Sequence, residues 1–157
     1  YIGIVLTVLL NVCFMTLLLL GLCLLYKITV SISFLASIIF ILFELILISA
    51  IAILFSTVST SLVTGMIFTS MLFLIGHLSH HLKYFSATSE NIFLKWTIKG
   101  FYYLIPNLEY FNLKDKLYAI ENISIPLDFV FKVFLYMLIY SVTTLAVAIA
   151  VFDKKEF

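Results

Sequence analysis

The sequence of 157 residues contains no arginine, and charged residues of both signs make up only 11% of it. Soluble domains carry about 25% charged and about 45–50% apolar residues, whereas 64% of this chain is hydrophobic. The composition therefore excludes an ordinary soluble globular domain. Nine lysines against eight acidic residues leave a net charge of +1, which provides no basic surface for nucleic acid.

Glycine and cysteine are also scarce. The five glycines form no Gly-x4-Gly-Lys-Ser/Thr loop, so we do not expect the chain to hydrolyse nucleotide by itself. Cys13 and Cys23 lie about 15 Å apart if their apolar run is helical, too far to form a disulfide. Because the common nucleophile and metal-hydrolase motifs are absent too, we expect neither an enzyme, nor a cofactor, nor a bound metal.

What the sequence does contain is four long apolar runs. A helix needs ~20 predominantly apolar residues to cross ~30 Å of hydrocarbon. Such runs cover residues 1–26, 32–55, 62–78 and 129–152. The sequence therefore predicts an all-α membrane protein, a single transmembrane domain with four transmembrane helices. The short connections at 27–31 and 56–61 predict that the first three helices are antiparallel neighbours.

The segment between the third and fourth runs, residues 79–128, is different in character. It holds ten of the 17 charges together with ten aromatic residues, a mixture suited to the membrane interface. An amphipathic helix is predicted over 91–105, with Phe93, Trp96, Gly100 and Tyr103 on one face and Pro106 at its end. A second helix is predicted from Leu108 to about Glu121. An irregular loop is the alternative for the whole segment.

Glu44 is the one ionisable residue near the middle of a predicted span. A carboxylate in that environment is costly and by default marks a functional site. Two interpretations stay open. Glu44 either contacts a proton or a substrate in a polar cavity, or it is a protonated group hydrogen-bonded to a neighbouring helix, with Ser49, Thr7 and Thr16 as candidate partners.

Three histidines, His77, His80 and His81, cluster at the end of the third run. Their spacing places them on one side of a helix, and imidazoles bind metals and haem. No cysteine or carboxylate lies close to them in the sequence. We therefore favour interfacial histidines at a helix terminus, with a membrane-embedded redox or metal-binding protein as an alternative function.

Several stretches resemble the permease subunits of bacterial type-2 ABC transporters. They are residues 50–57 (AIAILFST), 74–79 (LIGHLS), 102–113 (YYLIPNLEYFNL) and the ending 152–157 (FDKKEF). The resemblance extends over residues 44–157, and the block from Pro106 to Asn112 before the last span is its most specific element.

The resemblance implies a six-span subunit of an ATP-driven exporter in the bacterial inner (cytoplasmic) membrane. Such a subunit forms the translocation path as a homo- or heterodimer with a second permease subunit, and it docks on a separate ABC ATPase subunit. It also carries a non-spanning helical segment before its last span, on the side away from the ATPase. The chain would then be the last four spans, with the N-terminal part of the subunit missing and the C-terminus in the cytoplasm.

The permease interpretation assigns candidate residues to a translocation path or gate: Glu44, Phe93, Trp96, Tyr103, Tyr110 and Phe111. For the aromatic members, simple packing of an interfacial helix on its own bundle is equally compatible with the pattern. A third functional hypothesis is an accessory or purely structural membrane subunit. Co-purified ATPase, bound haem or metal, or neither would distinguish the three.

Overall fold

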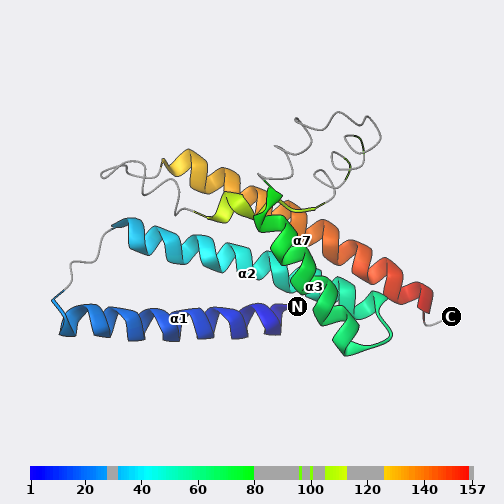
Figure 1. Ribbon diagram of the computed structural model, residues 1–157, viewed down its shortest axis with the longest axis horizontal. Helices are drawn as coiled ribbons and strands as arrows, with labels where there is room; N and C mark the ends of the chain where they lie inside the picture. Colours follow the sequence, from blue (N-terminus) through cyan, green and yellow to red (C-terminus); the bar gives the residue numbers. More distant parts are fainter. Residues whose placement is uncertain (28–31, 80–95, 97–99, 101–104, 113–125, 156–157) are drawn as a thin grey trace.

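The computed structural model describes residues 1–27, 32–79, 96, 100, 105–112 and 126–155 (Figure 1). In this part of the chain all regular secondary structure is helical, which confirms the predicted class. The elements are α1 (Ile2–Leu25), α2 (Ile32–Val58), α3 (Leu62–His77), the short 3-10 helix η1 (Leu108–Phe111) and α7 (Leu127–Lys155).

Three of these helices, α1, α2 and α7, are long and apolar enough to cross a membrane. The third predicted run forms α3, which has 16 residues and is therefore about 24 Å long. That length is less than the ~30 Å of hydrocarbon that a straight span must cross. All four predicted helices are present. Helix α3 is the one of the four that is too short to count as a membrane span by its length alone.

Helix α2 is the centre of the arrangement, and it contacts α1, α3, α7 and η1. Figure 1 shows α1 and α3 each running antiparallel to α2, while α7 runs in the same general direction as α2. The short connections predicted at 27–31 and 56–61 thus join antiparallel neighbours as expected.

The most extensive helix pair is α2 with α7. Buried positions recur every three or four residues along α7, and those of α2 are compatible with one helix face as well. On α2 they are Phe40, Leu47, Ala50 and Ile51, and on α7 they are Val133, Met137, Ser141, Thr144 and Ala148. The small residues of α7 allow close approach of the two backbones, which is how helices pack when lipid supplies no hydrophobic drive.

Two aromatic contacts fix the relative level of α2 and α7. The rings of Phe40 and Phe129 stack with centroids 5.8 Å apart, and those of Phe43 and Phe134 lie 5.5 Å apart. Lys132 pairs with Asp128 at 2.6 Å on the exposed surface near the start of α7. The middle of α2 therefore lies just past the charged beginning of α7.

Residues 105–112 fold back against this bundle. Pro106, Leu108 and Phe111 are buried, and η1 contacts both α2 and α3. Gly76 makes the approach possible, because a Cβ atom there would lie 2.7 Å from Cγ of Leu108 and 2.9 Å from the Pro106 carbonyl oxygen.

Asn107 joins this segment to two helices. Its Oδ1 accepts hydrogen bonds from the Ser79 hydroxyl at 2.7 Å and from the Glu109 N–H at 3.1 Å, and its own N–H donates to the Tyr136 hydroxyl at 2.9 Å. The side chain caps η1 while the backbone is tied to α7. One residue thus fixes the position of the segment.

The prediction of a continuous helix from Leu108 to about Glu121 is wrong at its beginning. The element that starts at Leu108 is a four-residue 3-10 turn, and Asn112 after it is extended, with φ −82° and ψ 104°. The interfacial helix predicted over 91–105 lies outside the described residues, apart from isolated positions, and so does the stretch 113–125.

Helix α1 differs from the others because it has no buried residue. It packs on α2, and the Tyr1 hydroxyl donates a hydrogen bond to the Ile46 carbonyl oxygen at 3.0 Å. The backbone turns out of the helix at Lys27, a non-glycine residue with φ of 53°. The core of the described structure is therefore built from α2, α3, η1 and α7.

Candidate functional site

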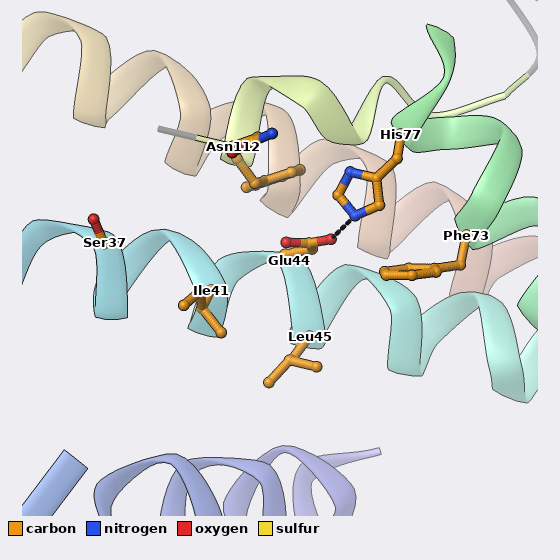
Figure 2. A pocket seen from close by; sticks show the side chains of 8 residues that line it. Ser37, Ile41, Glu44, Leu45, Phe73, His77 and Asn112 are labelled. Atoms are coloured by element: carbon orange, nitrogen blue, oxygen red, sulfur yellow. Dashed lines mark ion pairs between the residues drawn. The ribbon is translucent and has the colours of Figure 1, made fainter. Parts of the chain in front are cut away.

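The predicted functional carboxylate lies beside an imidazole. Nε2 of His77, the last residue of α3, lies 2.7 Å from Oε1 of Glu44 in α2. The two side chains are mostly enclosed, with 14% of Glu44 and 30% of His77 exposed. Figure 2 shows the imidazole reaching down from α3 onto the carboxylate, whose second oxygen points away from His77.

The geometry of the α2–α3 hairpin explains why these two residues meet. Glu44 lies fourteen residues before the end of α2, and His77 lies fifteen residues after the start of α3. Since both helices rise 1.5 Å per residue, antiparallel packing brings the two positions to nearly the same level. The imidazole Nε2 then lies within ion-pair distance of a carboxylate in otherwise apolar surroundings, where a charged group alone would be costly.

A cavity of about 460 Å³ opens beside the pair. Four of its lining side chains are polar, and four are aliphatic or aromatic. The polar ones are Ser37, Glu44, His77 and Asn112, and the apolar ones are Ile41, Leu45, Phe73 and Phe111. Concave sites of this size with a few polar groups in an apolar wall are typical of small-molecule binding.

The ring of Phe73 packs against the imidazole of His77. The rings of Phe73 and His77 are perpendicular, with centroids 4.6 Å apart, and Figure 2 shows the histidine above the flat face of the phenylalanine. This edge-to-face arrangement is the favoured geometry of aromatic pairs. His77 is therefore held between an aromatic face and a carboxylate.

The partners considered for Glu44 from the sequence are wrong. The Ser49 hydroxyl donates to Ile46, that of Thr7 to Gly3 and that of Thr16 to Val12, each to a backbone carbonyl oxygen of its own helix. The sequence does not suggest His77 as the partner of Glu44, because its neighbours His80 and His81 point to a metal cluster instead. The equal distance of Glu44 and His77 from the connecting turn was the signal that could have identified the pair.

The aromatic candidates that the structure describes lie in different places. Phe111 is 3% exposed and lines the cavity beside Glu44. Tyr110 faces α7, where its ring meets that of Tyr136 edge to face at 5.6 Å. Trp96 is 68% exposed, and Phe93 and Tyr103 lie outside the described residues. Of the six candidates, Glu44 and Phe111 are therefore brought together.

The metal-cluster alternative depends on His80 and His81, which lie outside the described residues. Within the part of the chain that the structure describes, no three histidine, cysteine, aspartate or glutamate side chains are grouped as a metal site requires. His77 is engaged with Glu44.

The described part of the chain is all-helical, with three helices able to span a membrane and an ion pair enclosed between α2 and α3. In comparisons with protein-family models, curated proteins and solved structures, nothing matches this chain.

Proposed function

We propose that this chain is the transmembrane permease subunit of an ATP-driven ABC exporter in the bacterial inner membrane. In this proposal two permease subunits form the translocation path, and a separate ATPase subunit hydrolyses the nucleotide. The resemblance of residues 44–157 to type-2 permeases is the origin of the proposal.

One structural observation supports it more than the others. The block from Pro106 to Asn112 carries the most specific part of the resemblance. It is the segment that packs against the helices before the last long helix, with Pro106, Leu108 and Phe111 buried. A permease of this type has a non-spanning element at that position. Irregular backbone at the level of the spans is tolerated where protein covers it, and here Leu108 and Phe111 are covered.

The enclosed ion pair fits the same proposal. Alternating access requires an element with two discrete arrangements. A contact between the end of α3 and the middle of α2 is a place where such a change can be controlled. We assign Glu44 and Phe111 to the path or gate, and Phe93, Trp96, Tyr103 and Tyr110 remain candidates for its outer part.

The test is purification of the tagged full-length chain from its native membranes in mild detergent. We expect a subunit with a phosphate-binding loop in stoichiometric amount and ATP hydrolysis by the complex. Substitution of the loop lysine in that partner should abolish hydrolysis and leave the complex intact. A stable chain that purifies without any ATPase subunit, after cross-linking in intact membranes, would contradict the proposal.

A further inference from the structure

We infer that the cavity between α2, α3 and η1 is a binding site for an amphipathic organic cation. Its positively charged group would lie against the Glu44 carboxylate, and its apolar part against Phe73 and Phe111. As an assignment of the transported substrate, this inference rests on the proposed function. Binding itself can be measured on the chain without any ATPase.

The electrostatics of the cavity favour a positive charge. Among the described residues that line the cavity, Glu44 is the only carboxylate and none is a lysine. The C-terminal end of α3, at His77, adds the partial negative charge of a helix terminus. In apolar surroundings both contributions are weakly screened, so a cation is attracted to the carboxylate where it takes the place of the His77 imidazole.

The lining favours an organic cation over a metal ion. A metal needs several convergent oxygen, nitrogen or sulfur ligands, and the described residues hold no group of three such side chains. Half of the lining is aliphatic or aromatic. Aromatic faces attract organic cations, and Ile41 and Leu45 offer apolar surface to the remainder of the ligand.

The position of the cavity gives such a ligand a route. Phe43 contacts Phe134, two residues past Lys132 at the charged start of α7, so Glu44 lies close to that end of the uncharged part of α7. An amphipathic cation gathers at the boundary between headgroups and hydrocarbon. It would reach Glu44 from there without crossing the full apolar layer.

His77 competes with an entering cation for the Glu44 carboxylate. Its Nε2 lies 2.7 Å from Oε1 of Glu44, on the side of the carboxylate that an entering cation would use. Among the described residues that line the cavity, Glu44 is the only carboxylate, while Phe111, in η1, and Asn112, directly after it, carry no charge. Binding should therefore require the imidazole to give up its contact with the carboxylate.

The experiment uses the full-length chain in lipid nanodiscs and a matched pair of probes, tetraphenylphosphonium and tetraphenylborate, which share size and shape and differ in the sign of charge. Equilibrium dialysis measures the bound fraction of each. We expect saturable binding of the phosphonium alone. Glu44→Gln should weaken it about tenfold or more, while Glu44→Asp retains it and Asp128→Asn, at the exposed start of α7, leaves it unchanged.

His77→Gln provides the second readout. It removes the imidazole that contacts Glu44 and should tighten phosphonium binding, which loss of a purely structural contact would not do. If Glu44→Gln does not yield folded protein, this variant and the probe pair decide the question. Unchanged affinity in Glu44→Gln, unchanged or weaker binding in His77→Gln, or equal binding of the borate would each overturn the inference.

The cation can be a free molecule or the ammonium of a lipid headgroup. Repeating the dialysis in discs of phosphatidylglycerol alone and in discs that also contain phosphatidylethanolamine separates these sources. Competition by the second lipid assigns the site to a headgroup, and its absence assigns the site to a free amphipathic cation. Loss of binding leaves the association with an ATPase untouched, so the inference and the proposed function fail separately.

Discussion

Nε2 of His77 lies 2.7 Å from Oε1 of Glu44, and this contact joins the last residue of α3 to the middle of α2. In the described structure, this pair places a carboxylate and an imidazole together in the interior. Because α3 ends here, the contact also sets where the chain leaves the hairpin and where residues 105–112 can dock.

The first prediction concerns the energetic coupling of this pair. We expect Glu44→Gln and His77→Gln each to lower the free energy of unfolding, and the double variant to cost less than the sum of the two. The expected interaction energy is about 1–3 kcal/mol, as for residues in direct contact. Denaturant titration in mixed micelles measures it, with Ser49→Ala as the control because its hydroxyl bonds only its own helix. Additive costs would show that the contact is not formed.

The second prediction concerns Gly76. An added methyl group would lie within 3 Å of both Leu108 and the Pro106 carbonyl oxygen, so Gly76→Ala should destabilise the protein by about 1–3 kcal/mol through overpacking. Gly21→Ala is the matched control in α1, where nothing lies within 4 Å. It should be neutral or slightly stabilising, because alanine is the better helix former. Thermal melting of both purified variants provides the comparison, and equal melting temperatures would refute the packing of residues 105–112 on α3.

Asn107→Ala is the third test. The substitution leaves the Ser79 hydroxyl and the Glu109 N–H without the oxygen they now share. We expect a loss of about 1–3 kcal/mol, the cost of unsatisfied buried donors. Asn11→Ala is the control, since that side chain is exposed and bonds only Thr7 of its own helix. Its expected effect is within about 0.5 kcal/mol. Unfolding in detergent measures the difference.

The fourth prediction separates the two contributions of Tyr136. Its ring packs against Tyr110, Phe111 and Tyr140, and its hydroxyl accepts the Asn107 N–H. Tyr136→Phe keeps the ring and should cost about 1–3 kcal/mol for the N–H left unpaired. Tyr136→Ala also removes the half-buried ring and should cost more than Tyr136→Phe, up to about 3–5 kcal/mol, the range for a fully buried aromatic. Equal effects in unfolding experiments would mean that the hydroxyl alone positions residues 105–112.

Much of the fold follows from the length of the apolar runs. The predicted run at 32–55 became α2 at Ile32–Val58, and the run at 129–152 became α7 at Leu127–Lys155. These helices were predictable because burial of their backbone groups in lipid leaves few alternatives. Differences of two or three residues at the ends reflect polar residues that continue the helix beyond the apolar stretch.

Only one of the two paired residues of the site, Glu44, could be predicted from the sequence. Glu44 stands out because any carboxylate in an apolar run does, but its partner is 33 residues away in sequence, and only the packing of the hairpin joins them. The helix predicted from Leu108 is wrong at its beginning for a local reason, and its remainder lies outside the described residues. The Asn107 side chain accepts a hydrogen bond from the Glu109 N–H, and Asn112 adopts an extended backbone that ends the 3-10 turn.

The exposure of α1 has a consequence for the order in which the structure unfolds. Its 24 residues include none that the rest of the chain buries, so its release would expose little of the core formed by α2, α3, η1 and α7. Stability is unevenly distributed in such a molecule, and the least protected unit opens first. A helix that is apolar along its whole length is thus the one on which the integrity of the Glu44 site depends least.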